Sequence, residues 1–200
     1  MTNVTPLIIG IGGTLRPESS SERALRLTLD AVEARGGRAV MFAGQDLDAP
    51  AYDFGAPLTP KMHALIEALR VADGVVLASP CYHGGISGLI KNALDYTEEM
   101  NRDVRPYLHG LVVGCIATGA GHQGPGMVLS SLRNIVHALR GWPCPLGVGI
   151  NTAEVNFTSN GCSDPRVGSR LTALADQVCD FIRLPQLGRE RTPQTLAMSA

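Results

Sequence analysis

Residues 10–21 read GIGGTLRPESSS and directly follow the apolar run LII at residues 7–9. A short buried strand therefore leads into glycines, then an arginine, then a series of hydroxyl side chains, before a helical pattern begins near Glu22. This order gathers backbone N–H groups, serine hydroxyls and the Arg16 guanidinium at a helix N-terminus, a common arrangement for binding phosphate. We therefore expect a strand–loop–helix unit that binds a phosphorylated ligand.

Two familiar nucleotide-binding sequences do not fit this loop. No Gly-Lys-Ser/Thr follows at the spacing of a Walker loop. The dinucleotide fingerprint G-x-G-x-x-G is also incomplete, because Leu15 stands where the last glycine belongs after Gly10 and Gly12. The expected ligand is therefore neither a Mg-bound nucleoside triphosphate nor an NAD bound in the Rossmann manner.

Apolar runs that suit buried strands alternate with helical patterns along the chain. Most of the runs are continuously apolar, as expected for strands covered on both faces. The predicted strands are residues 7–11, 38–43, 74–79, 111–117 and 146–150. Apolar residues at helical spacing predict helices over about 20–35, 62–69, 86–94, 128–139 and 167–182.

Strand–helix repetition of this kind predicts an α/β fold with right-handed crossovers and helices on both faces of a parallel sheet. Five strands in this length fit the flavodoxin-like, doubly wound order 2-1-3-4-5. In that order the ligand lies beyond the C-terminal strand ends, where strands 1 and 3 diverge. We expect one domain over residues 1–184, a long surface loop over 151–165, and a tail over 185–200 that is mobile or docked on a partner subunit.

Composition narrows the possible partners. The 200 residues with 44% hydrophobic content can form one domain with a substantial core. The formal net charge of −1, with scattered lysines and arginines, lacks the basic stripe of a nucleic-acid-binding protein. No apolar run approaches the roughly 18 residues of a membrane span, and the opening MTNVTP does not resemble a signal peptide. We expect a cytoplasmic protein with neither nucleic-acid nor membrane partners.

The five cysteines are widely spaced and include no C-x-x-C pair. This pattern disfavours a zinc site or a redox dithiol, and it predicts free thiols in a reducing compartment. No metal site is expected.

The predicted topology requires the loops after the third and fourth strands to complete the site. The first reads SPCYHGGISG at residues 79–88, where Pro80 is expected to end the strand, and the second reads TGAGHQG at 118–124. Their glycines allow the backbone to approach a ligand closely. A slot with amide donors and little side-chain bulk suits a flat heteroaromatic ring.

Residues 79–96, SPCYHGGISGLIKNALDY, resemble the signature of the NAD(P)H-dependent FMN reductase family. The segment GGTLRPESSS at 12–21 is similar to that family's Gly-Ser-x-Arg-x-x-Ser phosphate loop, with Thr14 in place of the usual serine. The segment ATGAGHQG at 117–124 resembles its third flavin loop. The resemblance covers roughly residues 7–150 and includes a motif too long for a chance match.

This resemblance implies a flavodoxin-like fold, bound FMN, and NADPH or NADH as co-substrate. The family includes flavin reductases of two-component monooxygenases, quinone, azo-dye and chromate reductases, and arsenical-resistance flavoproteins. The partners it implies are a small-molecule electron acceptor such as a flavin, a quinone or an azo dye, or a monooxygenase component. It also implies a homodimer or homotetramer with the flavin at a subunit interface.

The same resemblance assigns residues to the flavin. The FMN phosphate would be held by Thr14, Arg16, Ser19 and Ser21. The ribityl chain and ring would be lined, through backbone contacts, by Pro80, Cys81, Tyr82, His83, Gly84 and Ile86. The pyrimidine side would be bordered by Thr118, Gly119 and Gly121. No side chain is assigned a catalytic role, because the flavin itself carries hydride transfer. Position 83 is often asparagine in the family.

Two other functions stay open at this point. The first is a flavodoxin-type one-electron carrier without nicotinamide activity, for which we would expect aromatic ring covers and a strongly acidic surface. The second is a non-redox binding or hydrolytic module that uses Cys81. The net charge and the third loop, which lacks aromatic residues, favour a reductase whose open flavin accepts hydride from NAD(P)H and then passes it to a second flat acceptor.

Overall fold

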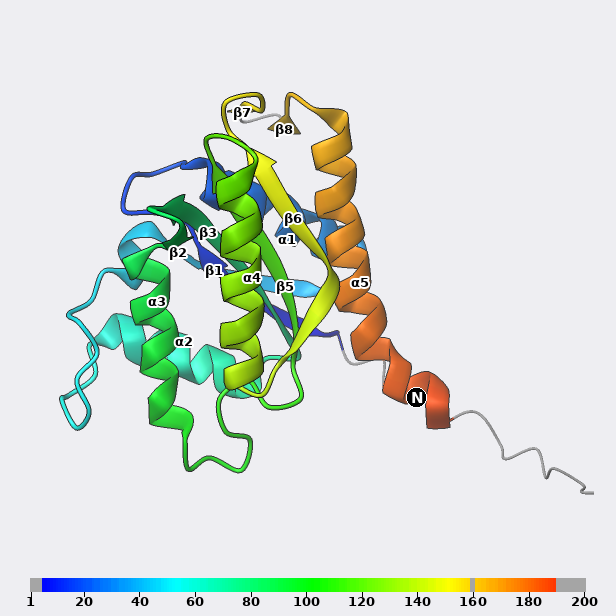
Figure 1. Ribbon diagram of the computed structural model, residues 1–200. Helices are drawn as coiled ribbons and strands as arrows, with labels where there is room; N and C mark the ends of the chain where they lie inside the picture. The colour runs from blue at the N-terminus through cyan, green and yellow to red at the C-terminus, as the bar shows by residue number, and fades with distance from the viewer. Residues whose placement is uncertain (1–4, 159–160, 190–200) are drawn as a thin grey trace, which may run out of the picture.

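The computed structural model describes residues 5–158 and 161–189. Five parallel strands form a central sheet with helices on both faces (Figure 1). The sheet order is β2-β1-β3-β5-β6. These strands are β1 (Leu7–Gly12), β2 (Arg38–Ala43), β3 (Gly74–Tyr82), β5 (Val112–Gly119) and β6 (Trp142–Asn151). Counted along the chain, the order is 2-1-3-4-5, which confirms the predicted flavodoxin-like fold.

The helices form two layers. One face of the sheet carries α1 (Ser20–Ala34) and α5 (Pro165–Arg189). The other face carries α2 (Pro60–Val71), α3 (Gly88–Asp95) and α4 (Gln123–Ala138). The short elements are the 3-10 helices η1 (Gly44–Leu47) and η2 (Tyr96–Met100), strand β4 (Gly85–Ile86) antiparallel to β3, and the pair β7 (Phe157–Thr158) and β8 (Gly161–Cys162).

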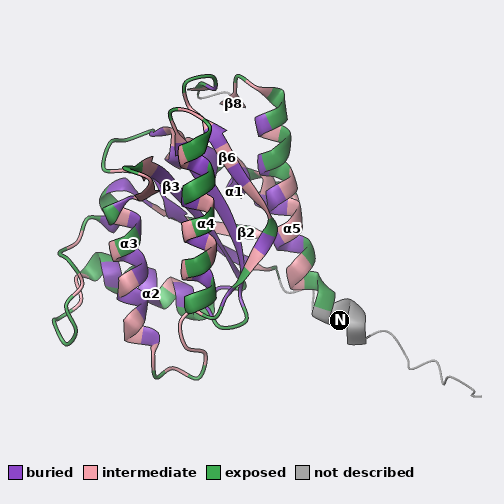
Figure 2. Cartoon of the chain, viewed as in Figure 1, coloured by how far each residue is buried: buried purple, intermediate pink, exposed green. Residues whose placement is uncertain are grey.

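Strand β1 shows why the apolar runs are continuous. Ile8 packs on the α1 and α5 side of the sheet, while Ile9 and Ile11 pack on the opposite side, and all three are fully buried. Figure 2 shows the same burial along the central strands. Fully burying one such side chain stabilises the fold by about 1.5–3 kcal/mol.

Two glycines of β1 set how closely its neighbours approach. A Cβ at Gly10 would lie 2.6 Å from Leu29 Cδ1 of α1, and a Cβ at Gly12 would lie 2.8 Å from Ala78 Cβ of β3. Both are shorter than real carbon–carbon contacts. A side chain at Gly10 would have to displace the end of the Leu29 side chain, and one at Gly12 would clash with Ala78, whose backbone oxygen lies 2.9 Å from the added Cβ. Gly12 therefore allows β1 and β3 to pack closely at the end of β1 that leads to the cavity.

The prediction that Pro80 ends its strand is wrong. Strand β3 continues through Pro80 to Tyr82, and Pro80 pairs with Thr118 of β5. Pairing with β1 stops at Ala78, so β3 has a sheet neighbour on only one side beyond that residue. A proline, which lacks an N–H, is tolerated where a strand has a free edge.

Three boundaries also differ from the expectation. Ile86, expected on a helical face, lies in β4 opposite Cys81. The expected loop 151–165 contains the β7–β8 pair. Helix α5 continues to Arg189, so the expected tail begins inside a helix, while residues 190–200 lie outside the described part of the chain.

Candidate functional site

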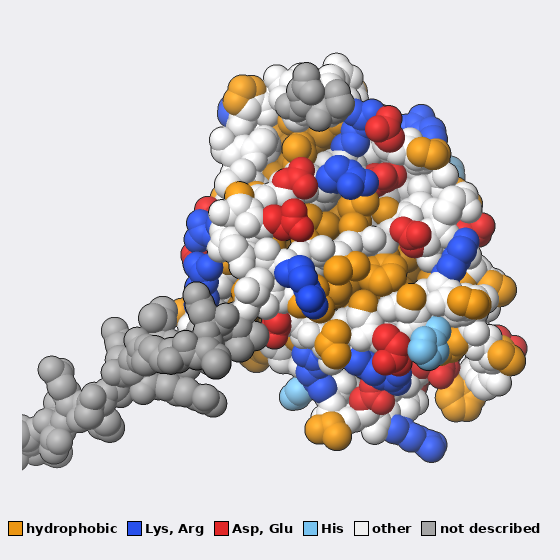
Figure 3. Space-filling view, turned by 180° about the vertical axis from the view of Figure 1, so that it is seen from behind, with side chains coloured by type: hydrophobic (Ala, Val, Ile, Leu, Met, Phe, Trp, Pro, Cys, Tyr) orange, Lys and Arg blue, Asp and Glu red, His pale blue; other side chains and the backbone are white. Residues whose placement is uncertain are grey.

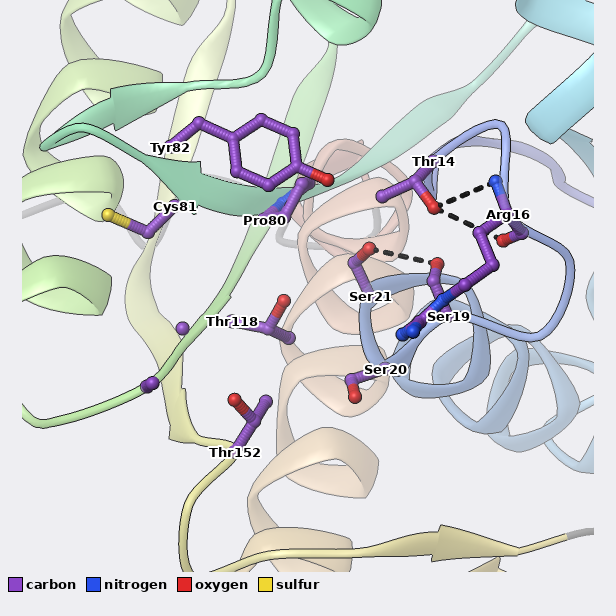
Figure 4. Close-up of a pocket in the computed structure, with 12 residues that line it drawn as sticks. Thr14, Arg16, Ser19, Ser20, Ser21, Pro80, Cys81, Tyr82, Thr118 and Thr152 are labelled. Atoms are coloured by element: carbon purple, nitrogen blue, oxygen red, sulfur yellow. Dashed lines mark hydrogen bonds between the residues drawn. The ribbon is translucent and has the colours of Figure 1, made fainter.

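A cavity of about 410 Å³ opens at the edge of the sheet where the strands end (Figure 4). It lies between the loop after β1, the end of β3 and the end of β5, which is the switch point of this strand order. Its lining residues are Thr14, Arg16, Ser19, Ser20, Ser21, Pro80, Cys81, Tyr82, Thr118, Gly119, Ala120 and Thr152. The three segments singled out in the sequence therefore meet in space.

The loop after β1 is held by its own hydrogen bonds. Gly13, with a φ of 88°, turns the chain out of the strand. The Thr14 hydroxyl then accepts a hydrogen bond from the Arg16 N–H and donates one to the Arg16 carbonyl, both at 3.1 Å. Thr14 therefore shapes the loop that presents Arg16.

Helix α1 begins directly at the cavity. Ser19 is its N-cap, and the Ser19 Oγ accepts a hydrogen bond from the Glu22 N–H at 3.3 Å. The buried hydroxyls of Ser19 and Ser21 lie 3.3 Å apart. Within the described residues, the N–H groups of Ser20 and Ser21 have no acceptor. Two helix N-terminal donors are thus left for a ligand.

Arg16 supplies a free positive charge beside these donors. In the part of the chain that the structure describes, its guanidinium forms neither a hydrogen bond nor an ion pair, whereas Arg23 of α1 pairs with Glu18 at 2.8 Å. In Figure 4 the Arg16 side chain reaches over Ser19 and Ser20. A free guanidinium, unpaired N–H groups and hydroxyls form a donor set that fits a phosphate group.

The second wall is the end of β3 with its turn into β4. Ser79 fastens this turn, since its Oγ donates to the Pro80 carbonyl at 2.8 Å and accepts from the Ser87 N–H at 3.0 Å. His83 and Gly84 form the tip of the turn with φ angles of 51° and 83°. The tip is short because both residues adopt the left-handed conformation, which glycine takes without strain.

The third wall is the glycine-rich loop after β5 together with the start of α4. It packs tightly on the second wall because Gly119 and Gly124 leave room for Cys81. A Cβ at Gly119 would lie 2.9 Å from Cys81 Cβ, and a Cβ at Gly124 would lie 2.8 Å from Cys81 Sγ. In Figure 4 the Cys81 sulfur points away from the middle of the cavity. The thiol therefore joins two loops rather than facing the space between them.

The third wall is also tied to the end of β6. The Asn151 side-chain oxygen accepts hydrogen bonds from Gly121 N–H at 2.7 Å and Ala153 N–H at 3.1 Å. His122 Nε2 lies 3.1 Å from Glu154 Oε1. Sequence reasoning missed Asn151, because an asparagine at the end of a strand carries no signal by itself.

The structure brings most of the predicted site residues to this cavity. Those that line it are Thr14, Arg16, Ser19, Ser21, Pro80, Cys81, Tyr82, Thr118 and Gly119. Gly84 and Gly121 line an adjoining cavity of about 450 Å³ that shares Cys81 and Ala120 with the first. His83 and Ile86 lie in the β3–β4 turn and line neither cavity. The cavity also contains Ser20, whose hydroxyl was expected in the phosphate loop, and Ala120, which lies within the stretch of amides from Gly119 to Gly121 expected at the ring. Thr152 was not predicted, because nothing in its local sequence indicates it.

The thiols show no sign of nucleophilic or metal chemistry. Cys81 forms no hydrogen bond with a base in the described residues, which weakens the hypothesis of a Cys81-dependent module. Burial raises the pKa of the Cys115 thiol to about 12 and that of the Cys144 thiol to about 11, so both stay protonated. Among residues 5–158 and 161–189, no three His, Cys, Asp or Glu side chains gather as metal ligands would.

A sequence profile of the NADPH-dependent FMN reductase family matches residues 6–154. This chain belongs to that family. It is therefore an NAD(P)H-dependent oxidoreductase of the FMN reductase type, with FMN as cofactor, as the resemblance predicted. The match includes all three walls of the cavity.

Two curated relatives of this chain are flavoproteins, and one solved structure has a similar fold. An iron-sulfur flavoprotein of Methanocaldococcus jannaschii is 27% identical over 197 residues, covering 88% of this chain and 97% of the relative. An FMN-dependent NADPH-azoreductase of Staphylococcus haemolyticus is 32% identical over 119 residues, covering 58% of this chain and 60% of the azoreductase. The NAD(P)H:acceptor oxidoreductase FerB of Paracoccus denitrificans has a TM-score of 0.70 at 18% identity, covering 90% of this chain and 98% of FerB. The last likeness shows the fold alone.

In the described residues, no group of cysteines gathers as the ligands of an iron–sulfur cluster would. Such clusters are held mainly by four cysteine thiolates. Of the five cysteines here, Cys115, Cys144 and Cys179 are buried in the core, and no metal-binding group forms in the described residues. Nor does any described helix have the length and apolar character needed to cross a bilayer.

Proposed function

We propose that this member of the family oxidises NAD(P)H and passes the electrons, by way of bound FMN, to a small-molecule acceptor such as a free flavin, a quinone or an azo dye. One observation carries the proposal: the free Arg16 guanidinium and the open N-terminus of α1 meet the ends of β3 and β5 around one cavity. The relatives that act on NADPH and azo compounds support the choice of acceptor class.

We assign the FMN phosphate to the donors at α1. Arg16 would supply charge, and the N–H groups and hydroxyls of Ser20 and Ser21 would supply hydrogen bonds. Thr14 acts mainly by holding the loop, because its hydroxyl already bonds to the Arg16 backbone. Ser19 caps the helix and keeps its first amides aligned toward the cavity.

We assign the ring to the space between the second and third walls. FMN supplies the hydride chemistry when it is bound. The Ala120 N–H has no acceptor within the described residues, whereas the Gly121 N–H is used by Asn151. Ala120, rather than Gly121, is therefore the amide that would stabilise negative charge at the edge of the ring. Pro80 and Thr118 would face each other across the paired strands beneath it.

An open ring face favours a reductase over a one-electron carrier. Tyr82 is the one aromatic residue lining the described cavity, and 53% of its surface is exposed. A nicotinamide must approach to within about 3–3.5 Å of the flavin, which a stacked aromatic cover would prevent. On the face seen in Figure 3, acidic and basic side chains are interspersed, unlike the strongly acidic surface expected of a carrier.

Two further features stay predictions from the family resemblance: a homodimer or homotetramer, and a monooxygenase component as a recipient of reduced flavin. The cytoplasmic location stays a prediction from the sequence. Size-exclusion chromatography with light scattering would measure the oligomeric state directly.

The test of the proposed function is a flavin titration combined with turnover. The purified protein should quench FMN fluorescence on binding, and NADH or NADPH should bleach the bound flavin under anaerobic conditions. Adding a flavin, a quinone or an azo dye should restore the flavin colour and sustain NAD(P)H oxidation. A protein that binds FMN but is not reduced by either nicotinamide would favour the one-electron carrier. A protein that cannot bind FMN would contradict both the reductase and the one-electron carrier.

A further inference from the structure

The two edges of the sheet differ in how their outward backbone groups are used. Strand β6 forms one edge, and its Pro143 and Pro145 have no N–H to offer. The Leu146 N–H donates to the Gln177 side chain of α5 at 3.0 Å. From the other helix layer, Arg133 of α4 donates to the Pro145 carbonyl at 2.9 Å. Helices on both faces therefore close this edge to a further strand.

Strand β2 forms the other edge, and its outward groups are open. The Arg38 N–H donates to the Pro6 carbonyl at 2.8 Å, which turns this residue toward β1. Because the residues of a strand alternate, the N–H and carbonyl groups of Ala39 and Met41 point away from β1. Among residues 5–158 and 161–189, none bonds to these groups. A strand edge in this state is a template for pairing with another chain.

The open part of β2 is short and apolar. Val40 lies between the two outward residues and is 39% exposed. Further along, the Asp46 carboxylate accepts a hydrogen bond from the Ala43 N–H at 3.2 Å, which closes the edge at that point. Figure 3 views the molecule from the side of β2, and hydrophobic side chains gather near the middle of that face. The unpaired segment is therefore residues 39–41.

This segment is complementary to a second copy of itself. If two copies run antiparallel about an axis at Val40, Ala39 of one lies opposite Met41 of the other, and the two exchange N–H···O bonds. Val40 then faces Val40 of the second copy in a pair without hydrogen bonds, where side chains lie closest. Every outward group of residues 39 and 41 would gain a partner.

The charges at the two ends of β2 match the same arrangement. Arg38 is exposed at the start of the strand, and its guanidinium bonds to nothing within the described part of the chain. Asp46 and Asp48 are exposed just beyond its end. In an antiparallel pair the start of one strand lies beside the end of the other, so Arg38 of each copy comes near the carboxylates of the second. An unrelated extended peptide lacks this match, which favours a second copy as the occupant.

We propose that residues 39–41 of β2 form an interface between two copies of this chain, which pair antiparallel into one continuous sheet. This interface does not depend on the proposed function, because no residue of β2 lines the cofactor cavity. FMN binding is therefore a separate measurement. The interface can coexist with a second subunit contact at the flavin, in which case the assembly is a tetramer.

The first test compares Val40→Lys with Val71→Lys, its matched control. Val40 stands at the centre of the pairing, where two lysines would face each other, whereas Val71 is exposed at the end of α2. Light scattering over a range of protein concentrations should give one mass for the wild type and Val71→Lys, and half that mass for Val40→Lys. The Kd for association should rise at least about tenfold in Val40→Lys. The Kd for FMN should change by less than about twofold in both variants.

The second test uses the charge at the start of the strand. Arg38→Glu places like charges near Asp46 and Asp48 of the second copy, so it should also raise the Kd for association. Its exposed side chain packs on nothing that the fold requires, which keeps this variant informative even if Val40→Lys is poorly folded.

Amide hydrogen exchange distinguishes a second copy from coverage by the same chain. The Ala39 and Met41 N–H groups should exchange slowly at high protein concentration, and about tenfold faster or more after dilution or in Val40→Lys. Protection by another part of the same chain, such as residues 190–200, would not change on dilution.

Four outcomes would overturn the proposed interface. The first is a wild-type protein that is monomeric at every concentration. The second is an oligomer whose mass is the same in Val40→Lys, which would place the contact elsewhere. The third is protection of the Ala39 and Met41 N–H groups that persists on dilution, which would assign this edge to the chain itself. The fourth is unchanged association in Arg38→Glu, which would contradict the antiparallel arrangement.

Discussion

The side-chain oxygen of Asn151 accepts a hydrogen bond from the Gly121 N–H at 2.7 Å, which ties the end of β6 to the glycine-rich loop after β5. Gly121 has a φ of 90°, and a Cβ there would meet no atom within 4 Å. The loop is therefore not packed in place by side chains at this point. Its shape depends on the asparagine.

Replacing Asn151 with alanine should loosen the third wall of the cavity. The Gly121 and Ala153 N–H groups would both lose their acceptor, at a cost of about 1–3 kcal/mol for each donor left unsatisfied, and less where water reaches it. We expect a lower midpoint of urea unfolding, weaker FMN binding and faster amide hydrogen exchange at residues 119–122. Asn156→Ala, in the same segment and exposed, is the control and should change none of these. Equal effects in both variants would contradict a specific role for Asn151.

Arg16→Ala should weaken FMN binding, because it removes a guanidinium that no described residue neutralises. A hydrogen bond to a charged group contributes about 1.5–3 kcal/mol, so the Kd measured by fluorescence titration should rise about 10- to 150-fold. Riboflavin, which has no phosphate, should bind both proteins equally. Arg26→Ala is the matched control, since Arg26 is exposed on α1 and pairs with Glu22. Unchanged FMN affinity in Arg16→Ala would remove this residue from the site.

The contribution of α1 and its loop could be predicted because its signal is local. Strand, glycines, arginine and serines follow one another in the sequence, and helix geometry alone brings Arg16 and Ser21 to one end. Asn151 and Thr152 could not be predicted in this way. Their position depends on the register that pairs Gly119 of β5 with Asn151 of β6, a contact between segments more than 30 residues apart.

Pro80 was placed wrongly for a related reason. Proline lacks the N–H that pairs with a neighbouring strand, so it commonly ends a strand that has neighbours on both sides. Pairing with β1 ends two residues earlier, so β3 has a free edge where the proline stands. The loss of a neighbour depends on where another strand stops, which the local sequence does not record.

Stability at high pH should depend on Tyr52, which packs against Tyr96 and whose hydroxyl donates to Glu99 Oε1 at 3.0 Å. Burial, followed by the hydrogen bond and the charge of Glu99, raises the pKa of Tyr52 to about 12 from its usual 10.0. The folded state therefore favours the neutral phenol. Its stabilising contribution is complete below pH 10 and is lost as the pH rises from 10 toward 12.

Urea unfolding measured across this pH range checks the effect. The free energy of unfolding should fall as the pH rises, and Tyr52→Phe, which cannot ionise, should show a smaller fall. Tyr82→Phe is the control, because Tyr82 is exposed and its hydroxyl has no partner within the described residues. A wild-type slope identical to that of Tyr52→Phe would contradict the shifted pKa.

Gly124→Ala should disturb the contact between the second and third walls, because the added Cβ would lie 2.8 Å from Cys81 Sγ. Overpacking of this kind costs about 1–3 kcal/mol, and we expect lower stability and weaker FMN binding. Cys81→Ala removes the sulfur, so the double variant Cys81→Ala/Gly124→Ala should recover both properties relative to Gly124→Ala alone. Recovery would show that the effect arises from this one contact, whereas additive losses would contradict it.

Cys81→Ala alone should keep NAD(P)H oxidation, since the thiol points away from the cavity and no base in the described residues bonds to it. A loss of turnover with intact FMN binding would instead indicate that the Cys81 thiol takes part in the reaction.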